Sequence, residues 1–396
     1  MNMNEQMKES EESILHTYNR FPVVFEKGQG CYLYDSEGKE YLDFAAGIAV
    51  NSLGYHYPGY DEALKDQIDK LMHISNLYYN EPIIEAGAKL VKASGMSKAF
   101  FTNSGTEAIE GALKAAKKYA YARDGHAGHE IIAMNHSFHG RSIGALSVTG
   151  TAHYREPFEP LMGGVKFADF NDLESVKTQI TDKTCAIITE VVQGEGGIYP
   201  AKKEFLEGLR QICDEKDIML IFDEIQCGMG RTGHYFAWQA YGVKPDIMTN
   251  AKALGCGVPV GAFVLGEKAA KASLEPGDHG TTYGGNPFVC AAVSKVFDIY
   301  ENDKIIEHVQ ETAPYLEQKL DELVAKHECA ATRRGMGFMQ GIVIQGRPVG
   351  EVVKAALAKG LLVISAGSDV LRIVPPLVIT KEHIDKMAAI LDECMK

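Results

Sequence analysis

The sequence predicts an α/β protein with a large, mostly parallel sheet and a second, smaller α/β domain. Two observations predict this fold. Between about residues 56 and 300, short apolar segments alternate with helical stretches, as in a parallel sheet covered on both faces. After residue 300 the pattern restarts with a long helical stretch followed by short strands, and 396 residues suffice for two domains. We expect an N-terminal segment 1–55 packing with the small domain, a large domain 56–300 and a small domain 301–396.

The individual elements follow from local patterns. Near the N-terminus, CYLYDSEGKEYLDF has two apolar runs joined by SEGKE, which predicts a hairpin. KAFFTNSG then predicts a strand that runs into the helix TEAIEGALKAAKKYAYA. Further strands are expected at HEIIAMN, TCAIITEVV, IMLIFDE and PDIMTNA, one or two strands at GVPVGAFVLGE, and helices at SVKTQI and EFLEGLRQICDEK. The small domain is expected to contain the helix DKIIEHVQETAPYLEQKLDELVAKH, strands in GFMQGIVIQG, LLVISAG and VLRIVPPL, and a final helix.

Composition excludes several classes of function. The formal net charge is −13 and no block of lysines or arginines occurs, which argues against nucleic acid or an anionic membrane as partner. The eight cysteines form no CxxC pair, so we expect reduced thiols in a cytoplasmic protein. The start, MNMNEQMKESEES, has no apolar region of a secretory signal, and no run reaches the ~18 apolar residues of a membrane span.

Polar residues follow the predicted strands, where ligands bind in parallel sheets. Ser104, Gly105 and Thr106 stand at a helix start, whose free N–H groups and dipole suit a phosphate. An ordinary capped helix is the alternative. Asp223 ends the apolar strand MLIF, so its buried carboxylate needs a cation or a strong donor. Alternatively, Asp223 and Glu224 cap a following helix.

The loop HSFHGRS carries an aromatic ring and a cation. Phe138 can stack on a flat cofactor, and Arg141 can clamp a carboxylate with two hydrogen bonds. His136 and His139 form an HxxH pair, but two histidines in a loop without a carboxylate are weak evidence, so no metal is predicted.

Lys252 lies in the glycine-rich, apolar stretch TNAKALGCGVPVGA, after another strand. An ammonium group beside apolar side chains needs a partner or loses its charge. A phosphate cradle, a stacking aromatic, a buried carboxylate and a lysine on successive strands are what pyridoxal phosphate requires. In this interpretation the lysine forms a Schiff base with the aldehyde, and the carboxylate keeps the pyridine nitrogen protonated.

These residues belong to motifs that identify a family. NSGTEA, FHGR, QGEGG, FDEIQCGMGRTG, AKALGCGVP and TTYGGNP occur in the order found in the fold-type I, class III (ω-amino-acid) aminotransferases. The chain resembles that family over nearly its whole length. YLDFAAGIAVNSLG, HISNLYYN and FFTNSGTEAIEGALKAAKKY make the N-terminal half most similar to the acetylornithine aminotransferases. The resemblance implies a large domain with a seven-stranded, mostly parallel sheet and a smaller α/β domain from both chain ends.

The resemblance also implies roles for single residues. Lys252 would be the Schiff-base lysine and proton carrier, and Asp223 would pair with the pyridine nitrogen. Gln226 would reach the ring hydroxyl, and Phe138 would stack on the ring. Ser104, Gly105 and Thr106 would hold the phosphate, and Thr282 would reach the cofactor of a neighbouring subunit, which implies a homodimer with shared active sites.

Two substrates must use one site in such an enzyme. Arg141 would bind the distal carboxylate of both, and Asn76 is also expected to contact substrate. Arg372, in LRIVPP, would bind the α-carboxylate of glutamate alone, and Glu195 would cover that arginine when the other substrate is present, because an unpaired buried arginine is costly. The alternative for Arg372 is a surface position on an edge strand.

Three positions depart from the family pattern. Tyr55 stands where histidine is usual, Asn250 where leucine is common, and Cys256 where glycine is usual. Tyr55 and Cys256 are expected to affect pocket shape or loop freedom. Ile48 lies near a tyrosine of ornithine aminotransferases, and an apolar residue there fits an acylated amine better than a free ammonium.

The sequence thus predicts a cytoplasmic, pyridoxal-phosphate-dependent aminotransferase of arginine biosynthesis, with N-acetylornithine and 2-oxoglutarate as substrates. Ornithine, 4-aminobutyrate, putrescine, N-succinylornithine and N-succinyl-diaminopimelate are alternative amino donors. A glutamate-1-semialdehyde aminomutase needs no switch between two substrates, so the presence of Arg141, Glu195 and Arg372 speaks against it. A binding protein on the same fold would be expected to lack Lys252 or Asp223.

Overall fold

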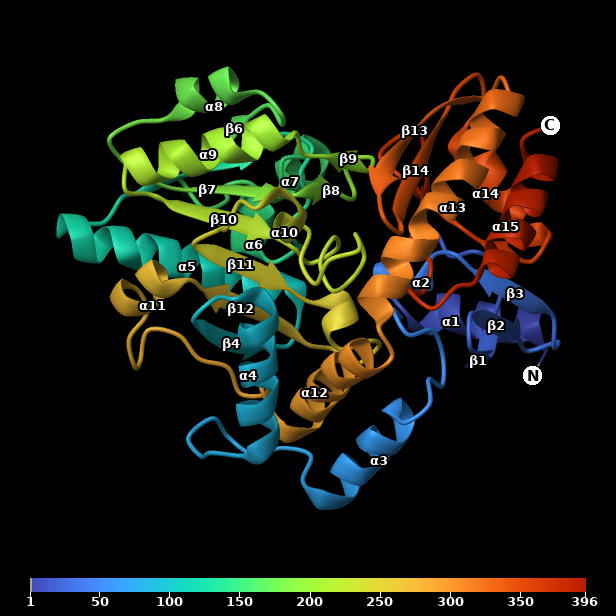
Figure 1. The fold of residues 1–396 in the computed structure, drawn as a ribbon, viewed down its shortest axis with the longest axis horizontal. Coiled ribbons are helices and arrows are strands. Elements are labelled where there is room, and N and C mark those ends of the chain that lie inside the picture. Colours follow the sequence, from blue (N-terminus) through green and yellow to red (C-terminus); the bar gives the residue numbers. More distant parts are fainter. Residues whose placement is uncertain (1) are drawn as a thin grey trace.

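The computed structural model describes residues 2–396, and its centre is a seven-stranded sheet (Figure 1). The strand order is β4-β12-β11-β10-β7-β5-β6. Neighbouring strands are parallel except at β12, which is antiparallel to both β4 and β11. The prediction of a seven-stranded, mostly parallel sheet is confirmed. Its strands are β4 (Lys98–Thr102), β5 (Glu130–Met134), β6 (Val165–Ala168), β7 (Thr184–Glu190), β10 (Met219–Asp223), β11 (Ile247–Asn250) and β12 (Gly261–Leu265).

Both faces of this sheet are covered, because its central strands are apolar on both sides. Every residue of β7 and β10 is buried, as expected for strands inside a parallel sheet. The longest covering helix, α5 (Gly105–Asp124), begins at the N-cap Ser104 and ends at Gly125, which has the left-handed conformation (φ 75°) common at helix ends. The other helices packed around the sheet include α4 (Glu81–Ser94), α9 (Lys203–Glu215), α11 (Glu267–Ala272) and α12 (Pro287–Asn302).

The C-terminal part forms a second sheet with the order β13-β14-β17-β16. All three pairings are antiparallel, and helices α13 and α15 pack together beside the sheet (Figure 1). The bounds are β13 (Ala330–Met336), β14 (Met339–Ile344), β16 (Ile364–Ala366), β17 (Val370–Ile373), α13 (Ile305–Lys326), α14 (Val349–Ala358) and α15 (Lys381–Cys394).

The two chain ends meet in a third sheet with the order β1-β2-β3-β15. The predicted hairpin is present as the antiparallel pair β2 (Tyr32–Asp35) and β3 (Glu40–Asp43), preceded by β1 (Phe25–Gln29). Strand β15 (Leu361–Leu362) joins β3 in parallel, so residues near position 42 pair with residues near position 361. The proposed domain boundaries at 55 and 300 remain predictions.

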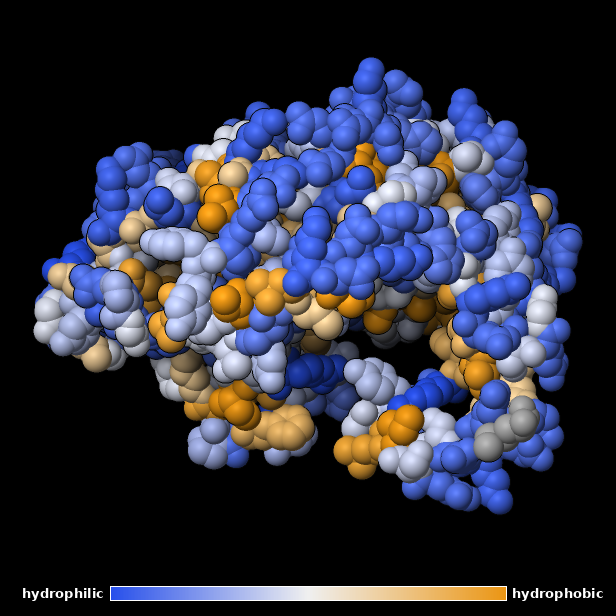
Figure 2. All heavy atoms as spheres, turned by 90° about the horizontal axis from the view of Figure 1, so that it is seen from below, coloured by the Kyte–Doolittle hydropathy of each residue, from blue (hydrophilic) through white to orange (hydrophobic). Residues whose placement is uncertain are grey.

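Short elements complete the described part of the chain, and none of its helices is long and apolar enough to span a membrane. Seen from below, the surface is mostly polar, with separate apolar groups and a hollow beside the N-terminal segment (Figure 2). The short elements that complete the described part of the chain are α1 (Met3–Ser13), α2 (Ala46–Ala49), α3 (Tyr60–Lys70), α6 (Ile143–Ser147), α7 (Ala152–Arg155), η1 (Glu156–Phe158), α8 (Leu173–Gln179), β8 (Val192–Gln193), β9 (Tyr199–Pro200), α10 (Trp238–Tyr241) and η2 (Lys252–Leu254).

Candidate active site

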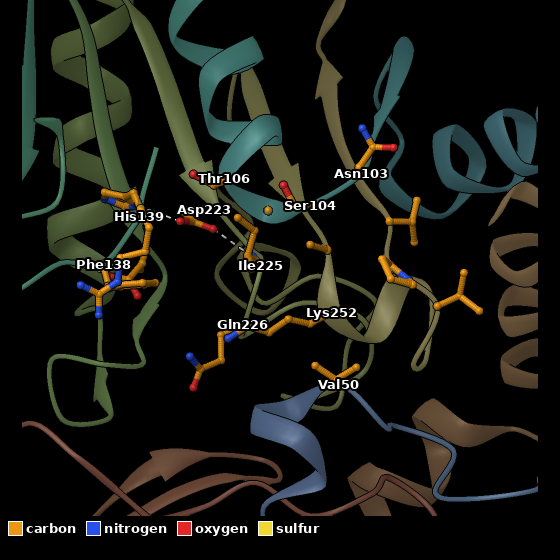
Figure 3. Close-up of a pocket in the computed structure, with 18 of the residues that line it drawn as sticks. Val50, Asn103, Ser104, Thr106, Phe138, His139, Asp223, Ile225, Gln226 and Lys252 are labelled. Atoms are coloured by element: carbon orange, nitrogen blue, oxygen red, sulfur yellow. Dashed lines mark hydrogen bonds and ion pairs between the residues drawn. The ribbon is translucent and has the colours of Figure 1, made fainter. Parts of the chain in front are cut away.

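A cavity of about 490 Å³ lies outside the carboxyl ends of the central strands (Figure 3). This is where the α/β architecture places ligand sites. The start of α5 and the ends of β10 and β11 contribute the polar groups, and Val50 faces them from the N-terminal segment. The sequence-predicted residues that line this cavity are Ser104, Gly105, Thr106, Phe138, Arg141, Asp223, Gln226 and Lys252.

Lys252 lies two residues after the end of β11, at the start of η2, and extends into the cavity (Figure 3). Its backbone has the left-handed conformation (φ 48°), which a residue with a side chain rarely adopts and which is common at functional sites. Burial lowers the pKa of the Lys252 amine to about 8; Glu195 opposes this shift and Arg372 adds to it. About a tenth of this amine is therefore neutral, and hence nucleophilic, at pH 7, far more than for an ordinary lysine.

Asp223 stands at the end of β10 and is buried. Its Oδ2 atom lies 2.7 Å from His139 Nδ1, while Oδ1 accepts hydrogen bonds from the Ile225 amide (3.0 Å) and the Thr249 hydroxyl (3.2 Å). Burial alone lowers the pKa of His139, but the hydrogen bond and charge of Asp223 raise it above its usual value. A carboxylate has about four acceptor positions, so Asp223 retains capacity for one more donor from the cavity.

No helix begins directly after β10, where the Asp223 carboxylate accepts the Ile225 amide in a turn, so the alternative that Asp223 and Glu224 cap a following helix holds only for Glu224. Turns follow, and the Glu224 carboxylate instead accepts the amides of Ala237 (2.8 Å) and Trp238 (2.9 Å), at the start of the distant helix α10.

The start of α5 forms a concave surface of backbone and hydroxyl groups. Ser104 caps the helix by accepting from the Glu107 amide (3.3 Å), and the first N–H groups of any helix lack partners within it. A Cβ on Gly105 would come within 2.9 Å of the Ile225 side chain, so this position keeps the backbone accessible. The Thr106 hydroxyl lies 2.8 Å from that of Ser142. Capping and anion binding are compatible here.

Phe138 and Arg141 belong to the loop after β5. The Phe138 ring meets Tyr154 edge-on, with 5.9 Å between ring centroids. The Arg141 guanidinium stacks on Tyr154 at 4.0 Å and lies 5.3 Å from the Phe138 ring. Stacking on aromatic faces leaves the guanidinium N–H groups free to bind an anion in the cavity.

Arg372 lies on β17 and is buried, so the alternative of a surface position on an edge strand is wrong: β17 lies between β14 and β16. Its guanidinium pairs with both carboxylate oxygens of Glu195, the Nη2–Oε2 distance being 3.4 Å, and donates to Gln226 Oε1 at 3.1 Å. Burial acts to raise the pKa of Glu195, but Arg372 and Lys252 outweigh it and hold that pKa below its usual value. The carboxylate is therefore an anion opposite the guanidinium.

Thr282 and Asn76 are not among the residues that line this cavity. Thr282 is exposed on the loop before α12, and Asn76 donates to the carbonyl of Gly284 on the same loop (2.8 Å). The neighbouring Thr281 accepts a hydrogen bond from Asn103, which lines the cavity (3.3 Å), and the proposed roles of Thr282 and Asn76 remain predictions.

Several residues of the site were not assigned a role from the sequence. His139 and Thr249 contact Asp223, and Val50 lines the cavity from the N-terminal segment. Glu190 ends the buried strand β7, and burial, aided by the charge of Asp223, raises its pKa to about 7. The signal that singled out Asp223, a carboxylate at the end of an apolar strand, applies equally to Glu190.

One group among the described residues has the spacing of metal ligands: Asp124, His126 and His129, at the end of α5. The Asp124 carboxylate is already engaged by Arg123, with two nitrogen–oxygen distances of 2.6 and 2.7 Å. The group lies at the end of α5 opposite to the cavity.

The residues present fit pyridoxal phosphate. The α5 start offers N–H groups and hydroxyls for a phosphate, Asp223 has a free acceptor position for a ring N–H, and the Lys252 amine has a depressed pKa. When bound, the cofactor supplies an aldehyde for amino-group exchange and a ring that withdraws electrons.

Comparison with known proteins defines the class. The chain belongs to the class-III aminotransferases, because the family model "Aminotransferase class-III" matches residues 14–395. It is therefore a pyridoxal-phosphate-dependent enzyme that moves amino groups between small amino and keto acids.

Individual relatives are similar over nearly their whole length. The acetylornithine aminotransferase of Methanocaldococcus jannaschii is 49% identical over 96% of this chain and 95% of its own. That of Clostridium acetobutylicum is 48% identical over 98% of this chain and 100% of its own. An ornithine aminotransferase structure from Toxoplasma gondii, which reports partial occupancy of PLP at its active site, has a TM-score of 0.95 at 29% identity and covers 100% of this chain and 94% of its own.

Proposed function

We propose that this aminotransferase exchanges an amino group between N-acetylornithine and 2-oxoglutarate, giving N-acetylglutamate 5-semialdehyde and glutamate, a reaction of arginine biosynthesis. The observation that carries the proposal is the Arg372–Glu195 pair next to Lys252, and the names of the two acetylornithine aminotransferases given above support it. The eight unpaired cysteines support a cytoplasmic location.

Lys252 would bond covalently to the cofactor and, once released, carry the proton between substrate carbon and cofactor carbon. A pKa near 8 suits both tasks, because the amine can accept and return a proton close to neutral pH. Asp223, oriented by His139, would hold a proton on the pyridine nitrogen. Ser104, Gly105 and Thr106 would hold the phosphate, Phe138 would stack on the ring, and Gln226 would reach the ring hydroxyl.

The arginines explain how one site accepts two substrates. N-acetylornithine reacts at its δ-carbon and glutamate at its α-carbon, so only glutamate has a carboxylate beside the reacting carbon. Arg141, stacked on Tyr154, would bind the distal carboxylate of either substrate. Arg372 would bind the α-carboxylate of glutamate after Glu195 withdraws, and Glu195 would return when N-acetylornithine is bound.

The Glu195 side chain is suited to such movement because 27% of it is exposed, whereas that of Arg372 is only 3% exposed. The carboxylate can therefore exchange the guanidinium for solvent, while the guanidinium keeps its place. An aminomutase with a single substrate has no use for this arrangement.

We also propose that the enzyme is a homodimer. Six large apolar side chains are exposed on the α3–α4 loop and the loop before α12, including Leu77 at 86% and Tyr79 at 95%. The two loops are joined, because Asn76 donates to Gly284 and the rings of His73 and Tyr283 lie 5.2 Å apart. Such a patch is typical of an interface. Its apolar members are Leu71, Met72, Leu77, Tyr78, Tyr79 and Tyr283.

Thr282 is the residue before Tyr283 of this patch. A second copy bound to the patch would therefore bring Thr282 toward the cofactor of the partner. Light scattering coupled to gel filtration tests this: a mass near twice 43.3 kDa is expected, and Tyr79→Lys together with Leu77→Lys should yield monomers. A wild-type monomer would contradict the proposal.

The half-reaction of the cofactor-loaded enzyme tests the substrate. N-acetylornithine, N-succinylornithine, ornithine, 4-aminobutyrate and putrescine are added separately without an acceptor, and loss of the visible cofactor band is followed. Fastest loss with N-acetylornithine supports the proposal. Faster loss with another donor would assign the enzyme to that donor and leave the residue roles intact.

A further inference from the structure

Residues 46–49, the short element α2, form a left-handed turn. All four have positive φ: Ala46 at 48°, Gly47 at 62°, Ile48 at 65° and Ala49 at 63°. Residues with a Cβ are disfavoured in this region, and consecutive ones are rare. Such strain persists only where surrounding contacts enforce it, and it concentrates where side chains must be held in place for function.

The enforcing contacts come from Asp43. Its Oδ1 atom accepts the amides of Ala45 (2.9 Å) and Ala46 (2.8 Å), at the entrance of the turn, and its carboxylate is buried. The Tyr55 hydroxyl donates to Oδ2 at 2.7 Å and accepts from the side-chain Nδ2 of Asn51 at 3.2 Å. The carboxylate of Asp43 is thus held on both oxygens, and it holds the turn.

The same segment is fastened to the loop that follows Lys252. The amide of Leu53 donates to Cys256 Sγ at 3.3 Å, and the Tyr60 hydroxyl donates to the carbonyl of Gly255. The Asn51 side chain also lies against Gly257, where a Cβ would be 3.3 Å from Asn51 Oδ1. Tyr55 and Cys256, two positions that depart from the family pattern, therefore both fasten this segment.

The turn places two apolar side chains at the site. Val50, the first residue after the turn, lines the cavity that contains Lys252 (Figure 3). Ile48 is 43% exposed and lines a neighbouring cavity of about 1060 Å³ whose wall includes Arg372. A regular right-handed turn would direct these side chains elsewhere, because the sign of φ sets the direction of each Cα–Cβ bond relative to the chain.

We propose that Asp43 and Tyr55 are positioning residues that hold the left-handed turn 46–49, so that Ile48 and Val50 form the apolar wall against which the amino donor binds. The identity of the donor in this proposal rests on the proposed function. The two residues act through the turn and do not themselves touch the reacting atoms.

Tyr55→Phe tests this, because it removes the hydroxyl from Asp43 and keeps the ring that packs on Gly28. We expect the KM for N-acetylornithine to rise about fivefold or more with kcat changed less than about twofold, since ground-state and transition-state binding are lost equally. Amide exchange of a peptide covering residues 44–50 should accelerate in the apoenzyme. Tyr34→Phe is the matched control, because it removes an exposed hydrogen bond from the Tyr34 hydroxyl to Glu40 (3.1 Å). It should change neither the KM nor the amide exchange of residues 44–50.

Ala46→Gly is the second variant, and it decides the matter if Tyr55→Phe fails to fold. Glycine is relaxed at φ 48°, so this variant should loosen the turn, accelerate exchange and raise KM without a lower Tm. Ala355→Gly in helix α14 should lower Tm and leave KM unchanged. Unchanged KM and unchanged exchange in the folded variants, or a fall in Tm alone, would overturn the proposal. If wild-type enzyme does not react with N-acetylornithine, the proposed function fails, but the exchange measurement still tests the turn.

Discussion

The Arg372 guanidinium and the Glu195 carboxylate face each other at the edge of the cavity that contains Lys252, and Arg372 also donates to Gln226 at 3.1 Å. The two side chains come from positions 177 residues apart. Because Arg372 is buried and Glu195 is partly exposed, the pair combines a fixed cation with a movable counter-ion.

Glu195→Gln should shift the preference of the enzyme toward glutamate. The amide cannot balance the charge of Arg372, so an α-carboxylate should bind there more readily and N-acetylornithine less readily. We expect the ratio of half-reaction rates, glutamate over N-acetylornithine, to rise by about tenfold, or about 1.4 kcal/mol. Stopped-flow absorbance at matched low concentrations measures it. Glu174→Gln, on the surface of α8, is the control; an unchanged ratio in Glu195→Gln would contradict the switch.

Lys252→Ala and Lys252→Arg should both abolish turnover, with losses of about 10⁴-fold or more. Alanine removes the amine, whereas arginine keeps the charge but cannot deprotonate. The comparison separates a need for nucleophilic nitrogen from a need for positive charge. Steady-state assays with N-acetylornithine and 2-oxoglutarate provide the measurement. Lys203→Ala and Lys203→Arg, at an exposed position on α9, should retain full activity; activity in either Lys252 variant would refute its role.

Cofactor capture by the apoenzyme should depend on pH with a midpoint near 8. Burial lowers the pKa of Lys252, and only the neutral amine reacts, so the rate should rise about tenfold per pH unit below the midpoint and level off above it. An ordinary lysine would show a rate still rising at pH 10. In Glu195→Gln the midpoint should move lower, because a carboxylate that favours the ammonium form is lost. A midpoint that moves upward in this variant would show that Glu195 does not act on Lys252.

His139→Phe should weaken cofactor binding. It removes the partner of Asp223 Oδ2 and leaves part of a buried carboxylate without a donor, which costs about 1–3 kcal/mol, or roughly 5- to 150-fold in the cofactor dissociation constant. Dialysis equilibrium monitored by cofactor absorbance measures this constant. His139→Asn keeps an N–H donor and should recover part of the loss. His153→Phe, on the exposed surface of α7, should bind cofactor like wild type; equal affinity in His139→Phe would contradict the proposed orientation of Asp223.

Asn250→Leu should stabilise the protein. Asn250 is completely buried on β11, and neither its amide oxygen nor its nitrogen has a hydrogen-bond partner among the described residues. Leaving such a group unpaired costs about 1–3 kcal/mol, so an apolar side chain should raise the free energy of unfolding by about 1 kcal/mol. Asn286→Leu is the contrast, because Asn286 caps α12 by accepting from the Val289 amide (3.0 Å) and its loss should destabilise. Chemical denaturation measures both; a less stable Asn250→Leu would mean that its polar atoms are used.

The outline of the site could be predicted from the sequence because the residues that carry chemistry follow apolar runs. Asp223 ends the strand β10 and Lys252 lies two residues beyond the end of β11, and both strands are buried at every position. A run of such strands folds into a parallel sheet with its carboxyl ends at one edge. The N-cap Ser104 likewise marks the start of α5. Local patterns of this kind can be identified without knowing which distant segments of the chain pair with these strands.

Other features depend on distant contacts and had no local signal. The antiparallel insertion of β12 between β4 and β11, and the pairing of β15 with β3, join strands from distant parts of the chain. The bond between His139 and Asp223 joins two segments 84 residues apart. Such pairings follow from which surfaces fit together, and the residue types alone leave many pairings open.

The sequence by itself therefore determined the class of fold, the order of the motifs and the side chains available for catalysis, because these follow from hydrophobic periodicity and local residue chemistry. The tertiary structure alone decided where Tyr55 and Cys256 act. AGIA at 46–49 has no sequence feature that requires a left-handed turn, since only Gly47 favours positive φ. The turn forms because Asp43 binds the amides at its entrance and because Leu53 bonds to Cys256, 203 residues away.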